Sequence, residues 1–250
     1  MADHLMKFGE FHQDSDGFLV VGDYRFAMSL VDFTQVTTEN EIVLLKSIET
    51  LNFYKELFSG KPIRNILEYG TWEGGSPIFL AAATNAQKIV GIDIREPSSA
   101  ILKHAATFGN RLTLAYETSQ ADRAKVNAIM DKSFDGAVDV VIDDASHQYE
   151  LTKGAFEIAF AKLRVGGYYI IEDWNWAHYE NRHYDEYWAD QRALSNLVMQ
   201  LALAVGSIGP IKSMNVMNWG VVVEKGAEVD PNFRLEDLIR MGPNRRYTLY

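Results

Sequence analysis

The feature that most constrains the fold is a regular alternation between short apolar runs and segments with helical periodicity. Five runs occur in order, NILE, KIVGID, LTLAY, VDVVID and GYYIIED, and a helical or loop segment follows each one. Apolar strands that alternate with helices predict a parallel sheet with helices on both faces. We therefore expect an α/β fold built on a doubly wound, Rossmann-like sheet.

Two further apolar runs near the end of the chain, IKSMNVM and WGVVVEK, are separated by the single residue Asn218. This spacing predicts an antiparallel hairpin that closes one edge of the sheet. Together with the five earlier runs, the hairpin brings the expected sheet to seven strands.

The N-terminal region does not follow the alternation. Residues 1–37 mix aromatic, acidic and glycine residues, which predicts a short hairpin or an irregular cover segment rather than a separate domain. Thr38 and Glu41 have capping-box spacing, and an apolar face follows, so we expect an amphipathic helix up to about Phe58. The main domain is expected to span residues 38–250.

A glycine-rich loop follows the first run, in the stretch ILEYGTWEGGSPIFLAAA. Its glycines, Gly70, Gly74 and Gly75, can adopt backbone angles closed to other residues and let a ligand approach the main chain. Ser76 can cap a helix that has Pro77 at its first position. Ligands of such sheets bind outside the carboxyl ends of the strands, so this loop is a candidate binding site.

The spacing of the loop, G-x-x-x-G-G, narrows the choice of ligand. It fits neither the G-x-G-x-x-G dinucleotide pattern nor the P-loop, which needs a following Lys-Ser/Thr. Glu68 at the loop entrance disfavours a pyrophosphate and suits a cationic amino group. The segment E-x-G-x-x-x-G-G-S resembles motif I of class I S-adenosylmethionine (SAM) methyltransferases. The resemblance implies SAM as cofactor, bound by Glu68, Gly70, Gly75 and Ser76.

Later positions extend this interpretation. Asp93 ends the second run at about the 20-residue distance at which an acid meets ribose hydroxyls in nucleotide-binding α/β folds. By the same resemblance, Ser119 and Gln120 in ETSQAD lie where methyltransferases usually contact the adenine. The structural alternative is that Asp93 only ends a strand and the glycines only make a turn.

Two runs end in paired carboxylates: VVIDDASHQYE contains Asp143 and Asp144, and YYIIEDWNW contains Glu172 and Asp173. The ends of neighbouring parallel strands lie about 5 Å apart, so these acids should converge at the edge of the glycine loop. Carboxylates so close repel one another unless a cation lies among them. Oxygen ligands favour Mg²⁺, with Ca²⁺ or Mn²⁺ as alternatives, over Zn²⁺.

The segments E-x-G-x-x-x-GGS, IDDASH and IEDW together resemble the metal-dependent O-methyltransferases of macrolide sugars, the mycinamicin type, and related proteins labelled cephalosporin hydroxylases. The resemblance covers roughly residues 66–176. It implies that His147 is the general base and that the metal ligands are Asp144, Glu172 and Asp173. Ala145 replaces a common glycine without altering the ligand spacing. Asp143 is expected either to contact the cofactor or to hold His147.

Each of these residues also has a purely structural interpretation. A histidine soon after a strand often bonds only to backbone, and acids at strand ends often cap the following helix. The chemistry nevertheless needs these groups, because a neutral hydroxyl is a poor nucleophile until its proton is withdrawn. A histidine with an ordinary pKa near 6.5 can accept that proton, and a metal can stabilise the developing charge.

We therefore expect an enzyme, a Mg²⁺-dependent SAM O-methyltransferase, with residues 38–250 as its catalytic domain. The acceptor is expected to be a hydroxyl of a small natural product, such as a sugar with vicinal hydroxyls, in antibiotic biosynthesis. One alternative is a SAM-binding, non-catalytic partner subunit of a biosynthetic enzyme. Another is a nucleotide-dependent oxidoreductase, against which the glycine spacing weighs.

Composition limits the partners. A net charge of −10 without a basic cluster argues against nucleic acid, and the absence of cysteine removes disulfides and thiolate metal sites. The run LVMQLALAV is too short to span a bilayer, and the N-terminus lacks the apolar core of a signal peptide. We expect a cytoplasmic protein that does not bind membranes, and the resemblance implies a homo-oligomer.

An aromatic segment follows the second acidic pair. Residues 174–188 contain three Trp and three Tyr, together with His178 and His183, whose spacing is not specific for a metal. We expect this segment to line the acceptor pocket, with packing against the sheet edge or a second subunit as the alternative.

Overall fold

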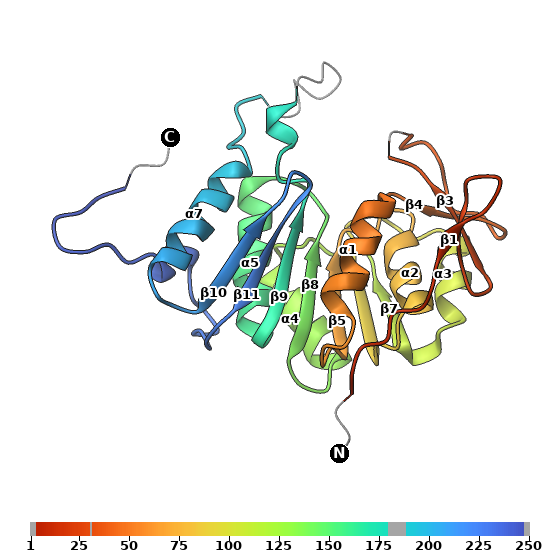
Figure 1. The fold of residues 1–250 in the computed structure, drawn as a ribbon, viewed down its shortest axis with the longest axis horizontal. Coiled ribbons are helices and arrows are strands. Elements are labelled where there is room, and N and C mark those ends of the chain that lie inside the picture. The colour runs from red at the N-terminus through yellow and green to blue at the C-terminus, as the bar shows by residue number, and fades with distance from the viewer. Residues whose placement is uncertain (1–3, 31, 180–188, 248–250) are drawn as a thin grey trace. The chain divides into compact units, whose positions relative to one another are not determined.

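The computed structural model describes residues 4–30, 32–179 and 189–247. The chain divides into two compact units, one of residues 1–119 and 129–135 and the other of residues 120–128 and 136–250. The α/β fold is confirmed: helices alternate with the strands of a mostly parallel, seven-stranded sheet that has a C-terminal antiparallel hairpin. Figure 1 labels these elements.

The first unit contains three parallel strands in the order β5-β6-β7. Its elements from this part of the chain are β5 (Asn65–Tyr69), α2 (Gly75–Ala83), β6 (Lys88–Ile92), α3 (Ser99–Ala106), η1 (Gly109–Arg111) and β7 (Leu112–Ala115). Every residue of β5 is buried, as expected for a parallel strand covered on both faces. The glycine loop connects β5 directly to α2.

The N-terminal region forms a second, four-stranded sheet in the same unit. Its strands are β1 (His12–Gln13), β2 (Leu19–Val21), β3 (Tyr24–Met28) and β4 (Ile42–Leu44). Phe26 of β3 is fully buried, and its ring lies 5.9 Å from that of Phe79 on α2. Because β3 pairs in parallel with β4, the segment before residue 37 and the chain after it share one sheet.

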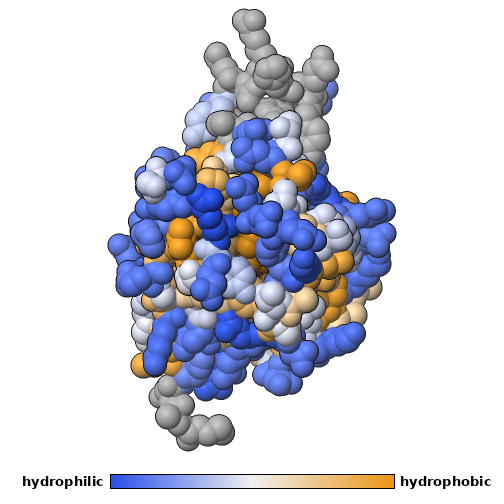
Figure 2. Space-filling model, turned by 90° about the vertical axis from the view of Figure 1, so that its right-hand side faces the viewer, coloured by the Kyte–Doolittle hydropathy of each residue, from blue (hydrophilic) through white to orange (hydrophobic). Residues whose placement is uncertain are grey.

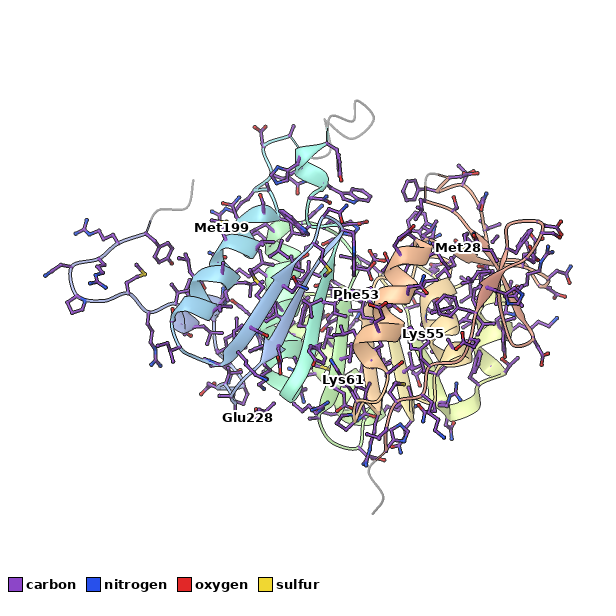
Figure 3. All side chains as sticks on the ribbon, in the orientation of Figure 1. Met28, Phe53, Lys55, Lys61, Met199 and Glu228 are labelled. Atoms are coloured by element: carbon purple, nitrogen blue, oxygen red, sulfur yellow. The ribbon has the colours of Figure 1, made fainter. Side chains whose placement is uncertain are left out.

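The helix expected from Thr38 is wrong in its first half. Thr38 forms a turn instead, because its hydroxyl accepts from the Glu41 backbone N–H at 3.2 Å. The β-branched run that follows pairs as β4, which overrides its helical periodicity. Helix α1 (Ile48–Phe58) begins after Ser47, whose side chain accepts from the Thr50 backbone N–H. Lys55 on α1 (Figure 3) pairs with Glu10 at 2.8 Å.

The second unit contains four strands in the order β8-β9-β11-β10. They are β8 (Val138–Asp143), β9 (Leu163–Glu172), β10 (Ile211–Val216) and β11 (Gly220–Lys225). The helical elements are α5 (Tyr149–Lys162), η2 (Trp176–His178), α7 (Ser195–Gly206) and η3 (Leu235–Leu238), and α4 (Arg123–Ser133) has residues in both units. Strands β8 and β9 are parallel, so Asp143 and Glu172 end neighbouring strands at the same edge.

Within the described ranges, no helix combines the length and apolar character needed to cross a membrane. Figure 2 shows one face of the molecule, on which hydrophilic side chains predominate and hydrophobic ones form separate small areas. The visible face therefore lacks a broad apolar surface among its coloured residues.

Candidate functional site

The glycine loop turns sharply between β5 and α2. Gly70 and Gly74 have φ values of +79° and +77°, which only glycine adopts readily. Gly74 is the N-cap residue of α2, and it provides no side-chain cap. The expectation that Ser76 caps this helix is wrong, because Ser76 lies inside the first turn. Its hydroxyl donates instead to Glu68 Oε1 at 2.5 Å.

Gly75 is required by packing inside the first unit. A Cβ at this position would lie 2.0 Å from the carbonyl oxygen of Val43 and 2.8 Å from Cα of Leu44. The backbone of β4 therefore passes so close to the start of α2 that no larger residue fits without a shift.

Glu68 lies at the entrance of the loop and is fully buried. Lys46 Nζ lies 3.7 Å from Glu68 Oε1, and the two side chains are 1% and 0% exposed. The negative charge expected at this position thus faces a cation of the chain itself. Removing one partner of such a buried ion pair strongly destabilises the folded protein, because the other charge is left buried and uncompensated.

Asp93 ties the end of β6 to the glycine loop. One oxygen of its carboxylate accepts from the backbone N–H groups of Thr71 and Trp72, each at 2.8 Å. The other oxygen accepts from the Arg95 backbone N–H at 2.8 Å. Asp93 therefore fixes the loop conformation, including the left-handed Trp72 (φ +47°). Ser119, the expected adenine contact in this unit, is half-buried.

The sequence analysis did not predict two residues beside the loop, Arg95 and Tyr116. Arg95 stacks on the Trp72 ring at 4.2 Å and pairs with buried Glu73 at 2.9 Å. Burial raises the pKa of nearby Tyr116 to about 12, and the Asp93 and Glu73 carboxylates add to the shift. The tryptophan in GTWEGG was a visible signal, but its partner lies 23 residues later, which no local pattern reveals.

In the second unit, three side chains from the two acidic segments converge. Asp144, His147 and Asp173 each offer one ligand atom, and these atoms lie within 4.8 Å of one another. His147 Nε2 lies 3.9 Å from Asp144 Oδ1. All three residues are half-buried, so they remain reachable from solvent.

The backbone at this cluster is unusual. His147 and Asp173 have φ values of +54° and +53°, although neither is glycine. The His147 ring stacks on Trp176 with centroids 4.7 Å apart, and the Asp173 backbone N–H donates to the Trp219 carbonyl at 2.8 Å. Strained residues that the surroundings hold in place are often functional.

The residues that lie together in this cluster match the expected metal ligands only in part. Asp144 and Asp173 are brought together, and His147, expected as the base, joins them. Glu172, the third expected ligand, is the buried last residue of β9 and is not in this group. The two carboxylates suit Mg²⁺ or Mn²⁺, whereas an imidazole ligand is typical of transition metals such as Zn²⁺.

Asp143 immediately precedes Asp144 of this cluster and is 2% exposed. Its carboxylate accepts from Tyr169 Oη at 2.8 Å and from Gln120 Nε2 at 3.1 Å. Burial raises the pKa of Asp143 to about 7; the Asp144 charge adds to the shift, and the hydrogen bonds oppose it. Gln120 and Asp143, both expected at the cofactor, therefore bond to each other.

The start of the aromatic segment packs beside the cluster. Trp176 stacks on His147, and Trp174 Nε1 donates to the Met217 carbonyl at 2.8 Å, next to the hairpin turn. His178 makes an edge contact with Trp174. Residues 180–188, including His183, lie outside the described residues.

Residues 67–174 match a family model described as a methyltransferase domain. No curated protein matches the chain in sequence. Three solved structures of the MycE methyltransferase from the mycinamycin biosynthetic pathway are similar to it. The complex with Mg and SAH is 24% identical, with a TM-score of 0.52, over 71% of this chain and 49% of that chain.

The MycE complex that also contains mycinamycin VI is 24% identical over 70% of this chain and 48% of that chain, with a TM-score of 0.52. A second crystal form gives 22% identity and a TM-score of 0.53 over 73% and 49%. At this identity the likeness concerns the fold, and this chain spans about half the length of MycE. The matched region begins just before the glycine loop and ends just after the acidic pair. Over residues 67–174 this chain is therefore similar to a methyltransferase domain.

Proposed function

We propose that this protein is a Mg²⁺-dependent O-methyltransferase that uses SAM to methylate a hydroxyl of a small natural product. The observation that carries the proposal is the convergence of Asp144, His147 and Asp173 in a methyltransferase domain. Methyl transfer to nitrogen seldom needs a metal, whereas a hydroxyl must lose its proton to react. A cluster that combines metal ligands with an imidazole therefore favours oxygen as the acceptor atom.

On the cofactor side, the proposal assigns SAM to the glycine loop. Gly70 and Gly75 shape the loop, and Asp93 fixes its backbone while offering carboxylate oxygens to ribose hydroxyls. Glu68, which accepts from Ser76 and lies 3.7 Å from Lys46 Nζ, is assigned to the amino group of the cofactor. The adenine is assigned to the segment that contains Ser119.

On the acceptor side, Asp144 and Asp173, which converge in the structure, would hold the metal, and Glu172, which lies outside their cluster, stays a proposed third ligand. When bound, Mg²⁺ supplies positive charge that stabilises an acceptor oxygen as it loses its proton. His147 accepts that proton, and its stacking on Trp176 fixes the plane of the imidazole ring. General-base help of this kind contributes about 10²- to 10⁴-fold.

The acceptor class follows from the same cluster. Two adjacent hydroxyls can reach one metal together, which favours sugars and other vicinal diols, and the aromatic rings of Trp174 and Trp176 suit a ring-shaped acceptor. MycE, with its mycinamycin complex, is consistent with this class. A role in antibiotic biosynthesis, a cytoplasmic location and a homo-oligomeric state belong to the same proposal.

The test is methyl transfer from labelled SAM to a panel of vicinal diols, including deoxysugar glycosides and catechols. Activity should disappear after exhaustive chelation and return with Mg²⁺. Asp144→Asn should lower the restored activity at least 100-fold. Full activity of chelated enzyme, or of Asp144→Asn, would rule out the metal assignment. SAM binding without turnover on any acceptor would favour a non-catalytic partner subunit.

A further inference from the structure

In the second unit, Gln120 and Tyr169 both donate hydrogen bonds to Asp143, the residue before Asp144 of the acidic cluster. Gln120 precedes α4, Asp143 ends β8, and Tyr169 lies inside β9; they are 7%, 2% and 0% exposed. None of them has a place in the proton transfer or the metal ligand set. Buried polar groups are costly unless they are hydrogen-bonded, so such a network needs a reason.

The Gln120 amide bridges two parts of the second unit. Its Nε2 donates to Asp143 Oδ1 at 3.1 Å, and its Oε1 accepts from the Ser146 backbone N–H at 3.1 Å. The orientation of the amide is dictated by chemistry, because a carboxylate only accepts and a backbone N–H only donates. The amide of Gln120 therefore provides the donor that Asp143 needs and the acceptor that the Ser146 N–H needs.

The carboxylate of Asp143 accepts hydrogen bonds from three groups. Tyr169 Oη donates at 2.8 Å, Gln120 donates on the other side, and the backbone N–H of Ala145 also bonds to the carboxylate. The network thus holds the backbone at residues 145 and 146. Those residues lie between Asp144 and His147, whose side chains come together in the acidic cluster.

The position of the bridge matters because the loop is strained. His147 has a φ of +54°, a conformation that persists only when the surroundings impose it. Ser146, immediately before it, is held by Gln120 through its backbone N–H. The described contacts thus link the left-handed turn at His147 to the buried core of the unit through Gln120 and Asp143.

We propose that Gln120, Asp143 and Tyr169 are positioning residues that set the geometry of Asp144 and His147, and that neither Gln120 nor Asp143 binds the cofactor. The inference rests on the proposed metal site. It reassigns Gln120, which the sequence pattern places at the cofactor, and for Asp143 it decides between the two roles expected from the sequence, contact with the cofactor and support of His147. Groups that orient metal ligands typically change metal affinity 10- to 100-fold when they are mutated.

The test compares metal and cofactor affinity in the full chain. Mn²⁺ binding is titrated by electron paramagnetic resonance, and S-adenosylhomocysteine binding is measured calorimetrically without metal. Gln120→Leu removes both hydrogen bonds of the bridge, and Tyr169→Phe removes a single hydroxyl. Tyr168→Phe is the matched control, because neighbouring strand residues point to opposite faces.

Gln120→Leu should weaken Mn²⁺ binding at least 10-fold and Tyr169→Phe about 3- to 10-fold. Both should keep S-adenosylhomocysteine affinity within about twofold, and Tyr168→Phe should change neither. A purely structural role would lower both affinities together, which would overturn the proposal. If Gln120→Leu does not fold, Tyr169→Phe decides alone.

Loss of cofactor affinity with unchanged Mn²⁺ affinity would place Gln120 at the cofactor and overturn the proposal. Unchanged Mn²⁺ affinity in both variants would overturn it as well, while leaving the metal site intact. If the unmutated protein binds no Mn²⁺, the metal part of the proposed function fails first, and the positioning role fails with it.

Discussion

Four non-glycine residues in the candidate loops have left-handed backbone angles: Trp72, Glu117, His147 and Asp173. Such conformations are uncommon outside glycine and cost about 1–3 kcal/mol each, so the surrounding contacts must impose them. At Trp72 the contact is Asp93, which accepts from its backbone N–H. At Asp173 it is the hydrogen bond to the Trp219 carbonyl.

At the residue scale, His147 has two possible roles that one substitution separates. If it is the general base, His147→Ala should lower turnover about 10²- to 10⁴-fold while Mn²⁺ affinity stays within a few-fold. The measurement is a turnover assay alongside a Mn²⁺ titration. Loss of Mn²⁺ affinity by more than 10-fold would make His147 a metal ligand, as its place beside Asp144 and Asp173 allows.

Asp143 should make stability depend on pH. Its pKa rises from 3.8 to about 7 in the folded protein, so the folded state binds a proton more tightly than the unfolded state does. The resulting stabilisation is complete below pH 3.8 and is lost as pH rises to about 7. The shift corresponds to at most about 4 kcal/mol.

Chemical denaturation of metal-free protein between pH 5 and pH 8 measures this effect. Relative to the unmutated protein, Asp143→Asn should gain stability as pH rises, because Asn has no charge to bury. A stability difference that does not change with pH would show that the Asp143 carboxyl titrates normally.

The sequence predicted that three residues of the acidic segments would lie together, but not every contact around them. Asp144, His147 and Asp173 were expected at one edge of the sheet, and they do meet. Strand ends and residue spacing predict such proximity, because strand geometry is regular. The bond between Gln120 and Asp143 was not foreseen, because it depends on side-chain conformations across 23 residues of chain.

At the element scale, helix α2 depends on its close approach to β4. Gly75→Ala should destabilise the protein by about 1–3 kcal/mol, because its Cβ would meet the Val43 carbonyl. Gly206→Ala at the end of α7 is the matched control, since a Cβ there meets nothing within 4 Å. Thermal unfolding of both variants makes the comparison. Equal melting temperatures would mean that β4 can move away from α2.

The same region limited the sequence-based prediction of elements. The alternation of apolar runs correctly predicted β5 to β9, and the short connection at Asn218 correctly predicted the hairpin β10–β11. Strand β4 was missed because an apolar stretch of three residues is compatible with both helical and strand periodicity. The stretch forms a strand because it pairs with β3, and no local sequence pattern reveals that pairing.

At the scale of the whole molecule, the two candidate sites belong to different units of the chain. The glycine loop belongs to the first unit, and the acidic cluster belongs to the second. The family match from residue 67 to 174 contains both, which is why one reaction is proposed for them. The fold likeness to MycE extends beyond that region, over 71% of this chain.

The most direct test of the central claim is calorimetric titration of the full chain with S-adenosylhomocysteine, with and without Mg²⁺, and with NAD as a control. We expect micromolar binding of S-adenosylhomocysteine in both conditions and no binding of NAD. Bound product at 100 times its Kd should also stabilise the fold by about 2.7 kcal/mol. Absence of S-adenosylhomocysteine binding in either condition, or binding of NAD in its place, would contradict the assignment of this loop to SAM.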